Sequence, residues 1–200
     1  MQKSKKITRI GKGRSIVAYP DRYIVVDIET TGLSTRENSI LEISALRYVD
    51  HTLVDKFSTL VHPYEPISAF ITELTGITNE MVQDAPNIAE CIDAFYAFVQ
   101  DDVLVGYNVN FDVNFLYDNL KVCSNKILHN DYIDVLRIAK RVLPYLPHHK
   151  QTDIASYYGI DIQGAHRAEK DCLICHACLE ALLKDVQKNE SIQSFCQSFK

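Results

Sequence analysis

The sequence has few of the residues that mark fibrous, disordered or membrane-spanning chains. Its 200 residues include no tryptophan, seven glycines and six prolines, and neither glycine nor proline forms a tract. A collagen-like or low-complexity chain is therefore excluded. No apolar run approaches the roughly 20 residues that a membrane helix needs. Hydrophobic residues make up 46% and charged residues 24%, which is typical of a globular domain that buries its own core.

Basic residues are scarce outside the N-terminus. Residues 1–22 hold seven lysines and arginines and one acid, and the rest of the chain holds 14 basic against 25 acidic residues, a net charge of −11. An acidic surface repels nucleic acid, so bound cations or the basic segment must offset the charge if the protein handles a polyanion. We expect residues 1–22 to form an arm that either frays in solvent or contacts nucleic acid or a partner.

A secretory signal is also missing, because the apolar stretch Ser15–Tyr19 is too short for one. Six cysteines without an export signal indicate reduced thiols, so we expect a cytoplasmic protein with no membrane attachment. The stretch Cys172–His176 matches the C-x-x-C-H pattern of c-type haem attachment. It also lies in a helical pattern in which the cysteines are small core residues. We therefore expect no haem, and an electron carrier is kept as an alternative.

The hydrophobic pattern predicts an α/β fold. Its strands are expected at 23–29, 40–49, 56–61 and 103–105, and the turn residues Asp50 and His51 join the second and third as part of an antiparallel meander. Helical spacing predicts helices at 87–100, 112–120, 133–143, 151–158 and 166–183, and a polar tail follows at 185–200. Strands first and then alternating strands and helices indicate a mixed sheet with helices on both faces.

Two acids lie inside the most hydrophobic strand. Asp27 and Glu29 are two residues apart, so the strand places both side chains on one face. Burying two like charges is costly unless a cation joins them, which points to a metal site. The alternative is that Glu29 marks the end of the strand and both carboxylates face water.

Two further acidic patterns follow in the second half of the chain. Asp112 lies where a strand leads into a helix, a position that favours active-site residues in α/β sheets, although Asn110 or Asp112 can also serve as a helix N-cap. His166 and Asp171 are five apart, so on one helix they do not stack but can flank a site, and an ordinary surface pair is the alternative.

Together these patterns resemble a known family. The stretch Asp27–Gly32, the pattern Asn108-x-x-Phe111-Asp112 and the pattern His166-Arg167-Ala168-x-x-Asp171 look like the three motifs of the DnaQ-like 3′–5′ exonucleases, in the subgroup with a histidine base. The proofreading subunits and domains of bacterial DNA polymerase III are the most similar branch. The resemblance spans residues 23–184, and it implies a ribonuclease H-like α/β fold and one exonuclease domain between the arm and the tail.

The resemblance also implies a mechanism. Asp27, Glu29, Asp112 and Asp171 would hold two divalent cations, Mg²⁺ or Mn²⁺, since carboxylate oxygens suit hard ions. His166 would accept the proton of the attacking water, because an imidazole titrates near neutral pH. The product would be a nucleoside 5′-monophosphate.

Substrate contacts are implied for the loop after the first motif and for the second motif. The residues are Thr30, Thr31, Gly32, Leu33, Asn108 and Phe111. In the simpler alternative, Gly32 turns the chain and Leu33 and Phe111 belong to the core. The expected substrate is a single-stranded or frayed 3′ end of DNA, beside a polymerase. RNA trimming by the same chemistry is an alternative, because nothing in the sequence reads the 2′-hydroxyl, and a non-catalytic binding module is a remote one.

Overall fold

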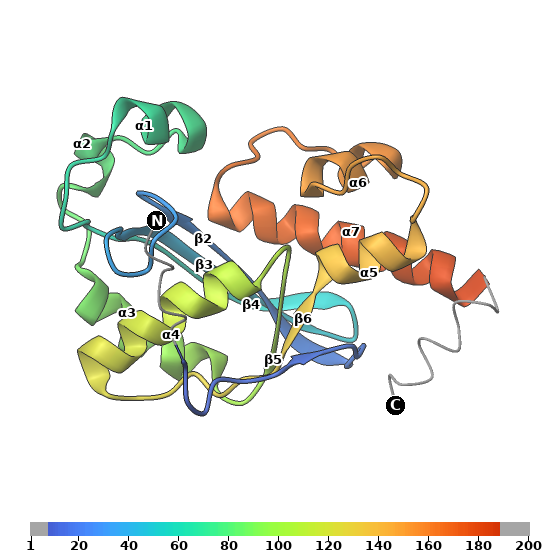
Figure 1. Ribbon diagram of the computed structural model, residues 1–200, viewed down its shortest axis with the longest axis horizontal. Coiled ribbons are helices and arrows are strands. Elements are labelled where there is room, and N and C mark those ends of the chain that lie inside the picture. The colour runs from blue at the N-terminus through green and yellow to red at the C-terminus, as the bar shows by residue number, and fades with distance from the viewer. Residues whose placement is uncertain (1–7, 189–200) are drawn as a thin grey trace, which may run out of the picture.

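A six-stranded mixed sheet forms the centre of the molecule (Figure 1). The computed structural model describes residues 8–188, so the first seven residues of the predicted arm and residues 189–200 of the predicted tail lie outside the described residues. The strand order is β1-β6-β5-β2-β3-β4. The bounds are β1 Ser15–Ile16, β2 Arg22–Thr30, β3 Ile40–Val49, β4 Thr52–Leu60, β5 Val103–Gly106 and β6 Tyr132–Asp134.

The sheet combines an antiparallel and a parallel half. Strands β2, β3 and β4 form the predicted antiparallel meander, and β5, β6 and β1 continue the sheet in parallel. Asp50 and His51 turn the chain between β3 and β4 with positive φ angles of 47° and 63°, as a tight hairpin turn requires. β4 begins at Thr52, earlier than the predicted start at 56, because pairing with β3 extends to the turn.

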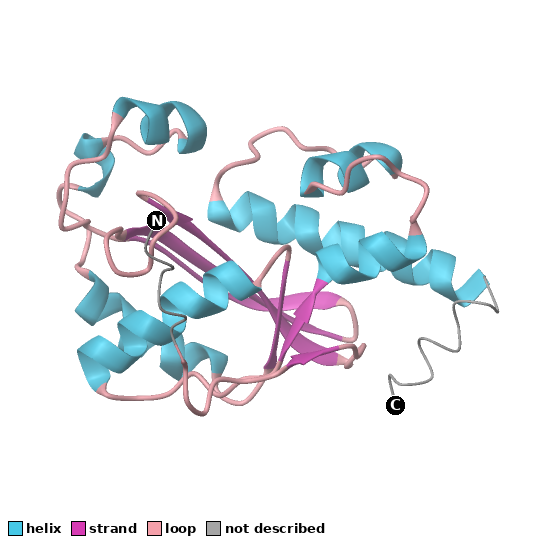
Figure 2. Ribbon diagram, viewed as in Figure 1, coloured by secondary structure: helices cyan, strands magenta, loops and turns pink. Residues whose placement is uncertain are grey.

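Helices cover both faces of the sheet (Figure 2), which confirms the predicted fold class. One face packs against α3, Ile88–Val99, and α4, Asn110–Ser124. The other face packs against α5, Val135–Val142, α6, Gln151–Tyr157, and α7, Ala168–Lys188. The short helices α1, Ala69–Thr75, and α2, Asn79–Val82, enclose a third, smaller core beside β3.

Strand β2 shows how the sequence places the acids. Ile24, Val26 and Ile28 point into the core under α3 and α4, whereas Tyr23 and Val25 point into the core under α7. Because side chains alternate along a strand, Asp27 and Glu29 continue the second series. Both carboxylates therefore emerge on the face that α7 covers.

Two of the predicted helices have different bounds. The segment predicted as one helix at 133–143 begins as strand β6, and α5 starts only at Val135, where the Asp134 side chain caps it by accepting from the Leu136 amide. The last helix starts at Ala168 rather than at 166 and continues to Lys188. No helix among residues 8–188 is both long and apolar enough to span a membrane.

The described part of the basic arm packs against the sheet. Strand β1 pairs with β6 in parallel, and Arg9 forms an ion pair with Asp118 of α4. The Tyr117 hydroxyl donates to the Ile10 carbonyl at 2.6 Å. Residues 8–22 thus add an edge strand to the sheet. The alternative that the arm frays in solvent is wrong for these residues.

Candidate active site

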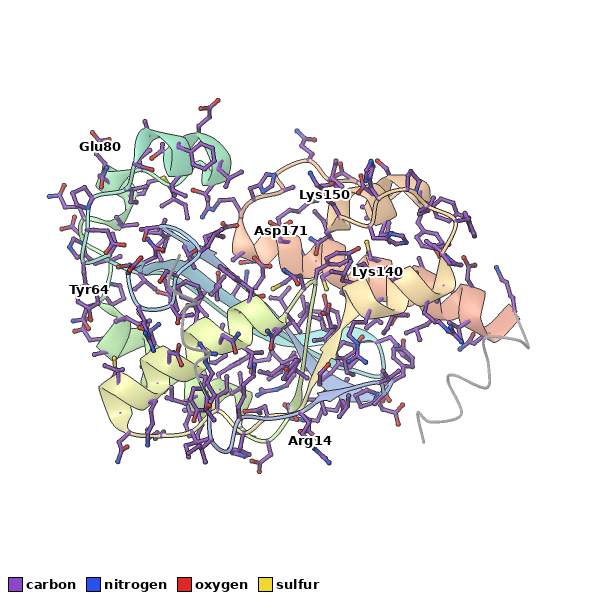
Figure 3. The ribbon with its side chains drawn as sticks, in the orientation of Figure 1. Arg14, Tyr64, Glu80, Lys140, Lys150 and Asp171 are labelled. Carbon is purple, nitrogen blue, oxygen red and sulfur yellow. The ribbon has the colours of Figure 1, made fainter. Side chains whose placement is uncertain are left out.

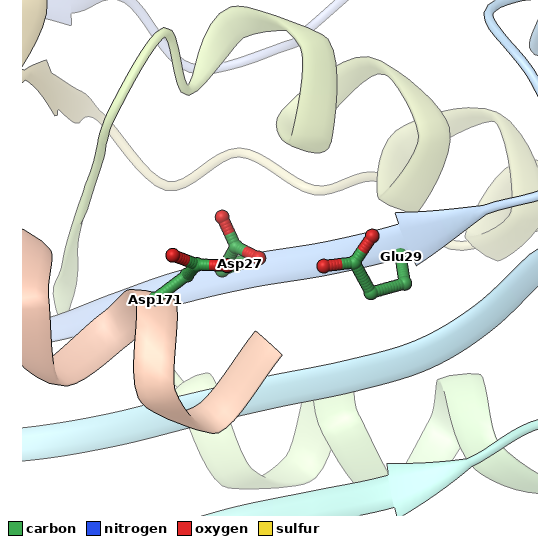
Figure 4. Close-up of side chains that lie close together, drawn as sticks. All are labelled: Asp27, Glu29 and Asp171. Atoms are coloured by element: carbon green, nitrogen blue, oxygen red, sulfur yellow. The ribbon is translucent and has the colours of Figure 1, made fainter. Parts of the chain in front are cut away.

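Three carboxylates meet between β2 and α7. Oxygen atoms of Asp27, Glu29 and Asp171 all lie within 4.8 Å of one another (Figure 4). Asp27 and Glu29 come from the end of β2, and Asp171 from the first turn of α7. The structure therefore brings together three of the four acids that the sequence predicts as metal ligands.

The electrostatics of this cluster are unfavourable without a cation. Burial raises the pKa of Asp27, and the neighbouring Asp112, Asp171 and Glu29 raise it further. Burial, with Asp171 and Glu42, raises the pKa of Glu29 to about 8. A pKa is raised when the charged form lacks compensation. A compact set of carboxylate oxygens without a matching side-chain cation fits a hard divalent ion.

Asp112 lies beside this cluster. It belongs to the first turn of α4 and accepts a hydrogen bond from the Ile28 amide at 3.2 Å. It does not cap its helix, since Val109 is the N-cap residue and makes no side-chain cap bond. Burial raises the pKa of Asp112 to about 8. Asp112 is outside the group of three acids within 4.8 Å, but its charge acts on Asp27.

The backbone at the turn between β5 and α4 packs closely against strand β2. A Cβ on Gly106 would lie 2.8 Å from the Val26 carbonyl oxygen and 2.6 Å from a Val109 methyl, so no larger residue fits. Asn108 follows with a positive φ of 57°, and its amide donates to Asp134 Oδ1 at 2.9 Å. Asp134 thus holds both this turn and the start of α5.

His166 precedes α7 instead of lying on it, so the prediction of a helical His–Asp pair is wrong. Its φ is +68°, and its side chain is exposed. The His166 amide donates to Asp171 Oδ2 at 2.8 Å, and the Gln151 side chain donates to Asp171 Oδ1 at 3.0 Å. The tight turn thus places His166 beside Asp171 and holds the Asp171 carboxylate in one orientation.

An ion pair between a buried carboxylate and a partly exposed guanidinium, which the sequence patterns did not indicate, anchors this turn. Glu42 of β3 is 4% exposed and accepts two hydrogen bonds from the Arg167 guanidinium, at 2.8 and 3.1 Å. It also accepts the Ala168 amide at 3.0 Å, at the start of α7. The sequence did contain a signal for Glu42, because it is an acid inside the apolar strand predicted at 40–49. The same kind of signal identified Asp27.

The loop after β2 is held by polar side chains. Thr30 Oγ1 donates to the Gly32 carbonyl at 2.7 Å, and the Thr31 hydroxyl bonds to Glu65. A Cβ on Gly32 would lie 2.7 Å from the Asn38 side chain, which would have to move to make room for it. Leu33 is 87% exposed, so the core alternative for Leu33 is wrong.

Phe111 is half-buried. It packs against Phe115, with ring centroids 4.9 Å apart, at the edge of the core under α3 and α4. This packing serves the core and leaves part of the ring open to the solvent.

The C-x-x-C-H segment is part of the core. Cys172 and Cys175 are 0% and 2% exposed on the face of α7 that packs on the sheet. The Cys172 thiol approaches the Val25 and Ser44 carbonyls, behind the carboxylate cluster. Both thiols are inaccessible to a haem, so the electron-carrier alternative has no structural basis.

A comparison with known families agrees with this geometry. The model of the exonuclease family, RNase_T, matches residues 24–179. The chain belongs to the exonuclease family. The match includes the three carboxylates of the cluster, Asp112 and His166.

Relatives of this exonuclease domain are much longer proteins. The chain is 36% identical over 180 residues to the DNA polymerase III PolC-type of Caldanaerobacter subterraneus, and the match covers 90% of the chain and 13% of the relative. It is 38% identical over 175 residues to the PolC-type polymerase of Clostridium perfringens, covering 88% of the chain and 12% of the relative. The chain thus spans about an eighth of the length of these relatives.

Solved exonuclease structures share the fold. A structure of exonuclease X in complex with 5′ overhanging duplex DNA superposes with a TM-score of 0.68 and 25% identity, covering 84% of this chain and 95% of that chain. E. coli exonuclease I in complex with a dT13 oligonucleotide superposes with a TM-score of 0.73 and 18% identity, covering 84% of this chain and 42% of that chain. The second likeness concerns the fold alone.

Proposed function

We propose that this exonuclease-family domain hydrolyses phosphodiester bonds from the 3′ end of DNA and releases nucleoside 5′-monophosphates. The observation that carries the proposal is the group of three carboxylates within 4.8 Å of one another, placed by β2 and α7. Family membership adds the reaction class. The proposed extent of the domain is residues 23–184, with 1–22 before it and 185–200 after it.

Two divalent cations, Mg²⁺ or Mn²⁺, fit this site. Asp27, Glu29, Asp112 and Asp171 would hold them. When bound, such ions neutralise the phosphate and stabilise both the attacking and the leaving oxygen. They also explain how a domain with an acidic surface accepts a polyanion.

The chain's own residues would move and place the reacting groups. His166 accepts a proton from the attacking water at a ring nitrogen, as expected for the histidine-base subgroup. The water oxygen bonds to phosphorus, the bond from phosphorus to the 3′-oxygen of the preceding nucleotide breaks, and that oxygen takes up a proton. Gln151 and the His166 amide orient Asp171 during these steps.

The terminal nucleotide would lie against the loop after β2. Thr30 and Gly32 would offer backbone amides to the terminal sugar, and the exposed Leu33 side chain would pack on the last base. The Thr31 amide already donates to the Ser39 carbonyl at 2.9 Å, so Thr31 would contribute through its position in the loop. Asn108 and Phe111 face the same nucleotide from the β5–α4 turn. Both side chains are accessible to a ligand, since Asn108 is exposed and Phe111 is only half-buried.

DNA is the proposed substrate because of the relatives. The curated relatives are DNA polymerases III, and the structural neighbours were solved with duplex DNA and with a dT13 oligonucleotide. We therefore propose a role in proofreading or repair, beside a polymerase in the cytoplasm. An RNA-trimming exoribonuclease of the same family is the alternative, and the relative rates on DNA and RNA decide between the two.

The test is a digestion time course. Single-stranded DNA and RNA oligonucleotides of one sequence, labelled at the 5′ end, are incubated with Mg²⁺, Mn²⁺ or a chelator, with Asp27→Ala as the control. We expect a ladder that shortens from the 3′ end by one nucleotide at a time, only with metal, and faster on DNA. Faster digestion of RNA would favour the trimming alternative. Binding without cleavage of either substrate, by folded protein with metal, would favour a binding module.

A further inference from the structure

A second pocket lies next to the carboxylate cluster. It has a volume of about 560 Å³ and lies between the β5–α4 turn, α5 and the segment that leads into α6. Tyr107 and Asn108 line it on one side, and Lys140, His149 and Lys150 on the other. Neither the three clustered carboxylates nor Asp112 lines this pocket, so it is separate from the proposed metal site.

The lining of this pocket is cationic. Lys140 and Lys150 supply its positive charge, two histidines also line it, and no aspartate or glutamate does. Lys140 and Lys150 are both exposed, and within residues 8–188 neither ammonium group lies within 4.0 Å of a carboxylate. Other lysines of the domain, such as Lys126 with Asp93, do form such pairs. Two lysines at one pocket that has no acidic lining residue attract an anion.

Gln151 connects this pocket to the site of cleavage. It lines the pocket, and its side-chain amide donates to Asp171 Oδ1 at 3.0 Å. Figure 3 labels Lys140, Lys150 and Asp171, which come from α5, from the residue before α6 and from α7. An anion in the pocket is thus one side chain away from the carboxylate cluster.

Hydrogen bonds hold the segment before α6, which forms one wall of the pocket. The His149 ring Nε2 hydrogen-bonds with the Leu143 carbonyl at 2.9 Å, and the His149 carbonyl accepts the Tyr107 hydroxyl at 2.6 Å. These bonds tie the segment before α6 to the end of α5 and to the β5–α4 turn. The backbone that carries Lys150 is therefore positioned before any ligand binds, which lowers the cost of binding.

We propose that this pocket binds a backbone phosphate of the single strand beside the phosphate that is cleaved. Lys140 and Lys150 would neutralise the phosphate, and the rigid segment would fix the direction in which the strand leaves the carboxylate cluster. The inference rests on the proposed function, because it assigns a position to the strand that the carboxylates cleave.

The test compares two substrates. The p-nitrophenyl ester of thymidine 5′-monophosphate carries only the scissile phosphate, whereas a single-stranded DNA oligonucleotide also carries its neighbours. In Lys140→Ala/Lys150→Ala we expect kcat/KM to fall about tenfold more on the oligonucleotide than on the ester. The matched control Lys121→Ala/Lys126→Ala removes the same charge from the last turn of α4 and the loop after it, and we expect the activity on the two substrates to change equally there.

Binding gives a second readout. In the Asp27→Asn background, removal of both lysines should lower the salt dependence of single-stranded DNA binding by about 0.7 log units per log unit of salt for each phosphate that is no longer neutralised. Equal decreases on both substrates, or a salt slope like that of the control, would overturn the phosphate pocket while leaving the exonuclease proposal intact. Absence of hydrolysis of both substrates by the wild-type chain would instead reject the proposed function.

Discussion

The sheet face under α7 carries two different polar clusters, one at each end: a group of carboxylates and a stack of aromatic rings. At one end, Asp27, Glu29 and Asp171 gather three like charges. At the other end, the His176 ring stacks on Tyr48 with centroids 3.7 Å apart, and its Nδ1 lies 3.1 Å from the Tyr23 hydroxyl. The same two strands and the same helix build both ends.

The two clusters differ in whether they need a bound ion to balance their charge. Burial raises the pKa of Tyr23 and of Tyr48 and lowers the pKa of His176, so burial favours the neutral form of each ring, and Glu180 is the acid that acts on all three. Burial raises the pKa of the acids as well, but their mutual repulsion calls for a bound cation. We conclude that the aromatic end raises the free energy of unfolding, whereas the acidic end lowers it and provides a site for a cation.

The largest effect is expected at Asp27. Asp27→Asn keeps the size of the side chain and removes the central charge, so we expect cleavage to fall by about four orders of magnitude, since metal-assisted stabilisation amounts to several kcal/mol. The free energy of unfolding without metal should stay equal or increase. Gel digestion and urea unfolding measure the two quantities. Retained metal-dependent cleavage in a clean preparation would show that Asp27 is not essential.

His166 extends the comparison to an exposed residue of the acidic end. His166→Ala should lower the rate by about 10²–10⁴ if the imidazole is the base, and it should leave stability unchanged because the ring is exposed. The pH–rate profile should lose the limb that the imidazole contributes. An unchanged profile would assign the proton transfer to another group.

Tyr48 tests the aromatic end. Tyr48 is 3% exposed, and Tyr48→Ala should lower the free energy of unfolding by about 3–5 kcal/mol, since it removes a large buried ring. Cleavage per folded molecule should change little, because the cluster lies at the other end. Tyr48→Phe, the matched control, keeps the ring stack and should cost less than about 1.5 kcal/mol. A decrease in activity larger than the decrease in folded protein would contradict the separation of the two ends.

Arg167 joins stability and activity at the acidic end. Arg167→Met leaves the buried Glu42 without its guanidinium, and we expect the free energy of unfolding to fall by about 1–2 kcal/mol, since the Arg167 side chain is 41% exposed and water screens the pair. Cleavage should also fall, because the turn that holds His166 and Asp171 loosens. Adding Glu42→Gln should recover stability. If the double variant is no more stable than Arg167→Met, the pair is not the anchor.

The last prediction is a pH dependence of stability without metal. The pKa of Glu29 and of Asp112 is about 8 in the folded chain, whereas carboxyls of an unfolded chain titrate near pH 4. The folded state therefore holds more protons between these values, and its stability falls as the pH rises through that range. Urea unfolding with a chelator should show a higher midpoint at pH 5 than at pH 8, and Mg²⁺ should reduce the difference. A midpoint independent of pH would contradict the uncompensated cluster.

Much of this molecule was predictable from local patterns. Strands β2 and β3 were predicted because they are long and rich in β-branched residues, and the alternation along β2 placed Asp27 and Glu29 on one face. Strands β1 and β6 were missed because two and three residues give no period, and their pairing partners lie far away in sequence.

The remaining differences at the site come from tertiary contacts. His166 leaves the helical pattern because Glu42 binds the amide of Ala168 and the side chain of Arg167, and this fixes the start of α7. Glu42 and Arg167 are 125 positions apart. Such a pair has no signature in a single sequence beyond a charged residue in an apolar strand.

The cluster draws its acids from opposite ends of the chain. Asp27 and Glu29 come from the first long strand, and Asp171 comes from the last helix. During synthesis the ribosome releases β2 long before α7, so the nascent domain carries two of its acids without the third. The three carboxylates therefore come together only when α7 docks, and an incomplete or partly unfolded chain lacks the assembled cluster.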